Sequence, residues 1–142
     1  MQVGNIKKSI VINTDVDHAW NHLSKIASLD WLEGQKSTKY ISQKKRGVAA
    51  KRLISFNDGS VVKEHIIGWH PKKYFSYIAT SGLPLNSYHA TISINQLQNH
   101  VKITWESYFS ANNDNSDFKS FVKFLSDFYI ASLKNLKNLL ES

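Results

Sequence analysis

The sequence contains no cysteine. This absence excludes disulfide bonds, catalytic thiolates and zinc sites with cysteine ligands. The chain of 142 residues does not need covalent cross-links, because a domain near this size buries about 68–70% of the surface that its unfolded chain exposes. We therefore expect a single domain spanning residues 1–142, with a full hydrophobic core.

Long hydrophobic runs are also absent. No stretch approaches the roughly 20 consecutive apolar residues that a transmembrane helix needs. The first eight residues, from Met1 to Lys8, lack the apolar run of a signal peptide. These observations predict a soluble, cytoplasmic protein without membrane insertion.

The motifs of the common catalytic and cofactor sites are missing as well. Gly-x-Ser-x-Gly, Walker A, Gly-x-Gly-x-x-Gly and His-Glu-x-x-His do not occur. His18 and His22 have the spacing of one helix face, but they lie beside Asp15 and Lys25 and opposite Trp20. A solvated helix face explains this pair better than a zinc site, so the sequence predicts no metal and no cofactor.

Acidic residues are scarce relative to basic ones. Lysine and arginine number 18 against 11 aspartates and glutamates, which gives a net charge of +7. One segment without any carboxylate holds Lys36, Lys39, Lys44, Lys45, Arg46, Lys51 and Arg52. Such a run could contact nucleic acid or an anionic membrane, but it lacks the regularly placed aromatics that stack on bases. Because edge strands often carry lysine, we expect a solvated hairpin and no nucleic-acid partner.

The C-terminal segment, residues 116–140, has the periodicity of one long helix with a broad apolar stripe. The stripe consists of Phe118, Phe121, Val122, Leu125, Phe128, Tyr129, Leu133, Leu136 and Leu140. A face this wide needs a large concave partner. A polar run from Asn112 to Asn115 precedes the helix.

Short alternating segments separated by turn signals fill most of the remaining chain and predict strands. The expected strands cover residues 6–13, 36–43, 48–56, 60–69, 74–80, 88–97 and 101–110. Thr14 and Asp17 predict the start of a short helix in a variant of the capping box, and a second short helix or turn is expected near residues 29–34. A sheet of this kind curled around the final helix predicts an α+β fold that encloses a cavity.

This order of elements resembles that of a known family. The resemblance rests on residues 12–20, Asp30-Trp31, Gly47, residues 64–71 from Glu64 to Pro71, residues 103–106 and the final helix. The chain resembles the START-like or SRPBCC superfamily, also called Bet v 1-like, and within it the bacterial polyketide cyclase/dehydrase and lipid-transport group. The resemblance implies a helix-grip fold, in which a curved seven-stranded antiparallel sheet wraps a long C-terminal helix, with two short helices after the first strand. It implies less about activity, because the superfamily includes carriers, receptors, cyclases and allergens.

A comparison with the plant abscisic acid receptors of this superfamily suggests residues that face a ligand. Asn86-Ser87-Tyr88 and Glu106-Ser107-Tyr108 resemble receptor segments that line the hormone pocket, and Lys36 is the nearest substitute for a receptor lysine that pairs with a ligand carboxylate. The resemblance implies that Tyr88, Glu106 and Tyr108 orient polar groups of a ligand. On the final helix it assigns the apolar wall to Phe121, Leu125 and Tyr129.

The segment Ser81–Asn86 predicts a mobile lid over the cavity mouth. Leu83 and Leu85 are apolar side chains on a connection that normally faces water, so covering a ligand would explain them. Packing on the rim of the sheet is the alternative. The sequence of this segment resembles that of the receptor gate loop, but the segment lies where those receptors carry their latch. The resemblance therefore does not imply a hormone-gated switch.

The orientation of Glu106 has two interpretations. Alternation on residues 101–110 places Val101, Ile103, Trp105 and Phe109 on the more apolar face, which would leave Glu106 in water. The family resemblance places Glu106 in the cavity instead, and we expect this second orientation. Burial would then raise the pKa of Glu106.

Three functions are compatible with the sequence. The first is a carrier, monomeric or weakly dimeric, that holds a small hydrophobic or amphipathic molecule such as a lipid, polyketide or isoprenoid-like compound. The second is a cyclase or dehydratase in which Glu106 and a tyrosine, with Tyr88 the candidate, move protons. The third is an interaction module that uses the basic surface.

Overall fold

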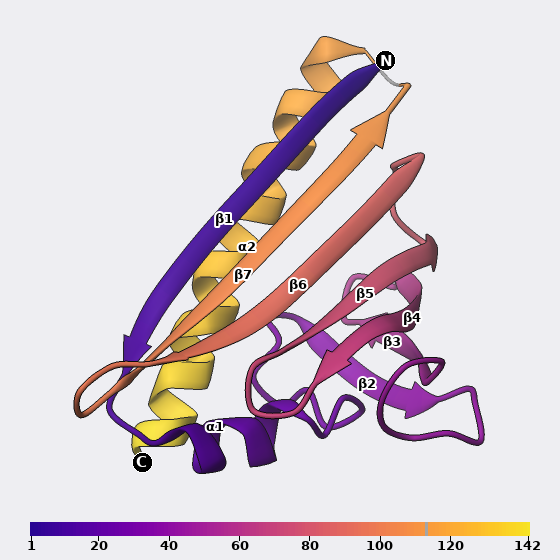
Figure 1. The fold of residues 1–142 in the computed structure, drawn as a ribbon. Helices are drawn as coiled ribbons and strands as arrows, with labels where there is room; N and C mark the ends of the chain where they lie inside the picture. Colours follow the sequence, from indigo (N-terminus) through magenta and orange to yellow (C-terminus); the bar gives the residue numbers. More distant parts are fainter. Residues whose placement is uncertain (113) are drawn as a thin grey trace.

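The chain folds as a strand, a short helix, six further strands and a long helix in the computed structural model, which describes residues 1–112 and 114–142 (Figure 1). The elements are β1 (Gln2–Ile12), α1 (Val16–Leu23), β2 (Gln35–Tyr40), β3 (Lys51–Phe56), β4 (Val61–His70), β5 (Tyr74–Ser81), β6 (Ser87–Gln96), β7 (Val101–Ala111) and α2 (Asn115–Glu141). The expected α+β architecture is confirmed. One residue of the polar run before α2, Asn113, lies outside the described residues.

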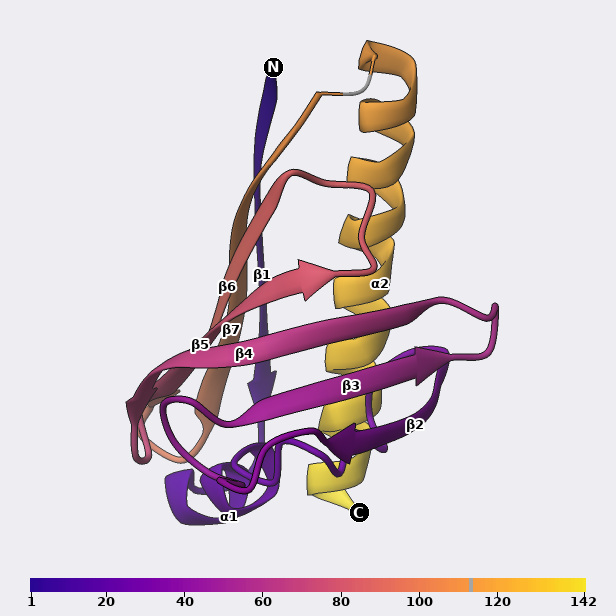
Figure 2. The same cartoon turned by 90° about the vertical axis from the view of Figure 1, so that its right-hand side faces the viewer.

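The strands form one antiparallel sheet in the order β1-β7-β6-β5-β4-β3-β2. β1, β7 and β6 run along α2, whereas β3 and β4 cross in front of it (Figure 2). Register shifts in the β4–β5 pairing, between Lys63 and Glu64 and between Ile66 and Gly68, help the sheet to bend. The sheet therefore curves around the helix as the sequence pattern predicts.

The helix α2 packs on the sheet mainly through its start and its C-terminal half. Near its start Phe118 lies against Phe109, and a Cβ atom on Gly4 would lie only 2.5 Å from the Phe109 ring. A larger residue at position 4 would therefore require the Phe109 ring to shift. Farther along, Leu133 and Leu136 are fully buried. Between these regions Phe121 is half-buried and borders an open space between helix and sheet.

The start of α1 differs from the expected capping box. Asp15 is the N-cap, and its side chain accepts a hydrogen bond from the His18 backbone N–H at 2.8 Å. Thr14 Oγ1 instead bonds to Nδ1 of His18 at 2.7 Å. Aspartate is among the best N-cap residues, so the prediction of Thr14 as the cap was wrong by one residue.

Among the described residues only one short helix follows β1, which corrects the expected second one. Residues 29–34 form turns, held by bonds from Leu32 N–H to the Leu29 carbonyl and from Gln35 N–H to the Leu32 carbonyl. Leu29, Trp31 and Leu32 are all buried in this conformation. The segment is fastened to α2, where Asn135 Nδ2 donates to the Trp31 carbonyl at 3.2 Å.

In the described part of the chain, none of the helices combines the length and the apolar character needed to cross a membrane.

Candidate functional site

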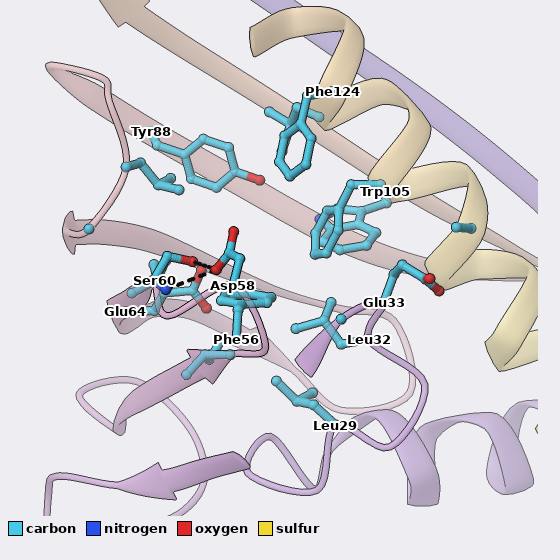
Figure 3. A pocket seen from close by; sticks show the side chains of 18 of the residues that line it. Leu29, Leu32, Glu33, Phe56, Asp58, Ser60, Glu64, Tyr88, Trp105 and Phe124 are labelled. Atoms are coloured by element: carbon cyan, nitrogen blue, oxygen red, sulfur yellow. Dashed lines mark hydrogen bonds between the residues drawn. The ribbon is translucent and has the colours of Figure 1, made fainter. Parts of the chain in front are cut away.

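A cavity of about 600 Å³ lies between the inner face of the sheet and α2 (Figure 3). Its volume falls within the range of about 300–1,000 Å³ that is typical of small-molecule sites. The sheet contributes mainly the side chains of Ile54, Val62, Ile92 and Trp105, and α2 contributes those of Phe121, Phe124, Leu125 and Phe128. The lining is thus predominantly apolar and aromatic.

The cavity mouth lies between two loops and the segment before β2. The turn between β3 and β4 contributes Asn57, Asp58 and Ser60, and the loop between β5 and β6 contributes residues 82–84. Asp58 fixes its own turn by accepting hydrogen bonds from the backbone and the hydroxyl of Ser60, and these bonds lower the pKa of Asp58. Phe124 of α2, 58% exposed, also lines the cavity and stacks on Phe128. The rim is therefore polar at the β3–β4 turn, apolar at the β5–β6 loop and aromatic on the helix side.

An ion pair is buried in the cavity wall. Arg52 of β3 and Glu64 of β4 are paired across the two strands. Arg52 is 3% exposed and Glu64 is 6% exposed. Nε and Nη2 of Arg52 each lie 2.8 Å from Oε1 of Glu64, and Nη1 donates to the Ile26 carbonyl at 2.9 Å. Burial raises the pKa of Glu64, and the Arg52 charge opposes that rise.

The guanidinium group of Arg52 also lies over aromatic rings. Its central carbon is 4.9 Å from the centre of the Tyr77 ring and 5.9 Å from that of Phe75. A guanidinium over a ring face is attracted by the ring quadrupole, more strongly where water is excluded. The arginine is thus held on the sheet by Glu64, by a backbone carbonyl and by two rings.

Two hydrogen-bonded pairs link other elements of the cavity wall, one joining β6 to α2 and the other joining β7 to β5 across β6. The hydroxyls of Tyr88 and Tyr129 bond to each other, and Trp105 Nε1 donates to the Tyr77 hydroxyl at 3.0 Å. Tyr129 stacks on Trp105 with ring centres 3.8 Å apart and an interplanar angle of 8°. Burial raises the pKa of all three tyrosines, so they remain neutral hydroxyls near neutral pH.

Several of the residues proposed from the sequence do lie at this cavity. Tyr88, Leu83, Phe121 and Leu125 line it. In Figure 3 the Tyr88 hydroxyl points into the space that Trp105 and Phe124 also face. Tyr129 is fully buried behind the wall and bonds to Tyr88 rather than lining the cavity itself.

Leu85 lies apart from the main cavity. It is half-buried beside a small pocket of about 60 Å³ under the β5–β6 loop, which Leu83 and Tyr88 also border. Both leucines pack against the core, so packing on the sheet accounts for part of their apolar character. The mobility of the loop remains a prediction.

The expectation that Glu106 and Tyr108 face the cavity is wrong. Glu106 lies on the outer face of β7, where Asn5 Nδ2 and the Tyr108 hydroxyl donate to its Oε2 at 3.3 and 3.1 Å. Tyr108 is 57% exposed, and the hydrogen bond to Glu106 raises its pKa. Ordinary alternation decides the orientation, because Trp105 and the other odd-numbered residues of β7 are buried on the inner face.

Lys36 does not reach the cavity either. It is exposed on β2, the edge strand, next to a register shift between Gln35 and Ser37. The cavity wall at this end is formed by Glu33 and Gly34 instead. The expectation that Lys36 faces a ligand is therefore corrected.

The sequence reasoning missed Arg52, Glu64, Tyr77 and Trp105 as site residues. Arg52 was counted with the basic hairpin, although it shares the parity of the buried Ile54. Glu64 likewise shares the parity of Val62 and Ile66. The alternation of residues along β3 and β4 thus indicates that both charged side chains point inward. Their opposite charges on adjacent strands then predict a pair.

Two arginines of the basic segment are bonded to other parts of the protein, so the segment is not the fully solvated hairpin that we expected. Arg52 is buried in its ion pair, and Nη2 of Arg46 donates to the Ser24 hydroxyl. Elsewhere His22 Nε2 lies 3.0 Å from Asp30 Oδ1. Within residues 1–112 and 114–142, no three side chains of the metal-binding types come together as a possible ion site.

The glycine at position 82 fixes the cavity mouth, and its substitution gives a first prediction. Gly82 has a φ of 101°, and an added Cβ would lie 2.0 Å from the Val61 carbonyl oxygen. Gly59, in the opposite loop, has a φ of 92° but nothing within 4 Å of an added Cβ. We expect Gly82→Ala to lower the free energy of unfolding by more than the roughly 1–2 kcal/mol of positive-φ strain, and Gly59→Ala by no more than that strain. Denaturant unfolding of both variants measures this difference, and equal losses would contradict the close packing of the loop on β4.

A curved antiparallel sheet that holds a long C-terminal helix over an apolar cavity defines a helix-grip protein. The sequence matches the family described as polyketide cyclase/dehydrase and lipid transport over residues 4–141, and the chain belongs to this family. No curated protein matches it significantly in sequence.

Solved structures show the same fold. An uncharacterized protein from Bacillus thuringiensis has a TM-score of 0.82 and 20% identity, with 98% of this chain and 100% of that chain covered. The protein XoxI from Bacillus cereus has a TM-score of 0.82 and 20% identity, with coverage of 96% and 94%. A protein from Nitrosospira multiformis has a TM-score of 0.82 and 16% identity, with coverage of 98% and 97%. At these identities the similarity concerns the fold alone.

Proposed function

We propose that the protein binds a small hydrophobic or amphipathic molecule, such as a lipid, a polyketide or an isoprenoid-like compound, between the sheet and α2. The observation that carries this proposal is the cavity of about 600 Å³, with its mainly apolar lining and a few inward polar groups. Pockets of this composition are typical of small-molecule sites. The family description, which includes lipid transport, agrees with it.

Binding without catalysis is the function that the side chains favour. The cyclase or dehydratase alternative relied on Glu106, which lies on the outer face of the sheet. The tyrosines of the cavity wall have raised pKa values and already bond to each other or to Trp105. Their hydroxyls are suited to orienting a ligand and, with raised pKa values, poorly suited to accepting a proton as a general base.

Filling the cavity from the helix side tests the proposal. Leu125 is buried and lines the cavity in the middle of α2. We expect Leu125→Trp to reduce the affinity for Nile red, a neutral environment-sensitive dye, at least about tenfold, because the indole occupies the space of the dye. The remaining cavity volume should limit the overpacking cost to roughly 1–3 kcal/mol. Fluorescence titration measures the affinity, and circular dichroism confirms the fold.

The matched control is Ile130→Trp. Ile130 lies on the same helix but is 45% exposed, so its substitution should leave dye binding unchanged. A folded Leu125→Trp variant that binds the dye as tightly as the wild type would place the site elsewhere.

A further inference from the structure

Only one of the two carboxylate oxygens of Glu64 is bonded to another of the described residues. Both contacts from Arg52, through Nε and Nη2, end on the same oxygen, Oε1. Oε2 accepts no hydrogen bond from a side chain or backbone group of the described residues. The residue is 6% exposed and lines the cavity. A carboxylate oxygen accepts hydrogen bonds, and Glu64 lines the cavity, so a bound molecule that supplies a donor can bond to Oε2 from the cavity.

The charge of the pair restricts what this molecule can be. Arg52 remains protonated, and its positive charge balances the Glu64 carboxylate. A ligand carboxylate beside Glu64 would add a second negative charge in an apolar cavity, and a ligand ammonium would add a second positive charge near Arg52. Either addition leaves an uncompensated charge away from water, which is costly. The site therefore favours a neutral group.

A hydroxyl group meets these requirements. It is neutral, it donates one hydrogen bond, and its lone pairs can accept from the guanidinium N–H groups of Arg52 that these contacts do not use. A hydrogen bond to a charged partner is stronger than one between two neutral groups. An ether or a hydrocarbon of the same size would leave Oε2 without a donor.

We infer that the ligand is a neutral amphipathic alcohol whose hydroxyl donates to Oε2 of Glu64, while its apolar body lies against Trp105, Phe121, Leu125 and Phe128. This inference rests on the proposed function, because it requires the cavity to be the binding site. It adds the ligand class and the residue that recognises it.

Two probes with equal numbers of carbon and oxygen atoms test the donor directly. 1-Decanol can donate a hydrogen bond, whereas methyl nonyl ether can only accept one. Each competes with Nile red for the wild-type protein, and decanoate at neutral pH tests the effect of charge. We expect 1-decanol to bind about tenfold or more tightly than either the ether or decanoate.

The double variant Arg52→Met/Glu64→Leu is the matched control, because exchanging a whole buried ion pair for apolar residues of similar size is often tolerated. We expect this variant to bind the dye, and we expect the alcohol and the ether to displace the dye from it equally well. In the wild type, the ¹³Cδ resonance of Glu64 should shift on addition of 1-decanol and not on addition of the ether. This second measurement does not depend on the folding of any variant.

The outcomes separate the two proposals. Equal competition by alcohol and ether in the wild type, or tighter binding of decanoate, would overturn the alcohol inference and leave the cavity as the binding site. An alcohol preference that survives in the double variant would overturn the role of Glu64. Failure of the dye and of all three probes to bind would overturn the proposed function itself.

Discussion

Replacing Glu64 alone with leucine is expected to lower the free energy of unfolding by about 3–5 kcal/mol, because the substitution leaves the charge of Arg52 buried without a partner. Arg52 cannot lose its proton, and it is 3% exposed. The double variant Arg52→Met/Glu64→Leu should recover most of this loss, since neither charge remains. A double-mutant cycle by denaturant unfolding measures both effects.

The single variant Arg52→Met should behave differently, because Glu64 can take up a proton. Without the Arg52 charge, which opposes the rise, the pKa of Glu64 moves further above the ordinary value of 4.5. The folded state then holds a proton that the unfolded state releases, so the stability of this variant should fall as pH rises above about 4.5. It should approach the wild type at lower pH.

Glu106→Leu is the control for both variants. Its carboxylate lies on the outer face of the sheet and is partly exposed, so we expect a loss below about 1 kcal/mol. Glu64→Leu with an effect as small as that of Glu106→Leu would show that the buried pair is not formed in solution.

Trp105→Ala should destabilise the protein about as strongly as Glu64→Leu, with an expected loss of about 3–5 kcal/mol. The side chain is 2% exposed, stacks on Tyr129 and donates to Tyr77. Its ring is also in edge contact with Trp31, with centres 5.8 Å apart. Its removal loses these contacts and enlarges the cavity.

Thermal and denaturant unfolding measure the effect of Trp105→Ala, and the same titration with Nile red shows whether the larger cavity still binds. Tyr108→Ala is the matched control on the same strand, because Tyr108 points outward and is 57% exposed. Losses of similar size for the two variants would contradict the assignment of the inner face of β7.

The fold could be predicted because hydrophobic periodicity determines which surfaces are buried. The alternation of β7 and the broad stripe of α2 each indicated a buried face. The segment 29–34 was harder, since Leu29, Trp31 and Leu32 suit a helix or a turn by composition. Its conformation depends on contacts with α2 that are distant in sequence, such as the bond from Asn135.

The site could be predicted only in part. The helix wall of Phe121 and Leu125 followed from the apolar stripe together with the family resemblance. Glu106 was misplaced because the resemblance was allowed to override the alternation of β7. Arg52 and Glu64 were missed because charged residues are normally assigned to the surface. Both residues occupy inward-facing positions of their strands. Burial is tolerated there because each charge neutralises the other across two adjacent strands.

Native mass spectrometry of gently purified protein is the strongest test of ligand binding between the sheet and α2, because it detects a small molecule held without covalent attachment. We expect wild-type protein to carry an added mass that organic extraction removes, and Leu125→Trp protein to lack it. A wild-type protein that carries no added mass, and that acquires none when incubated with 1-decanol or a neutral lipid extract, would contradict ligand binding between the sheet and α2.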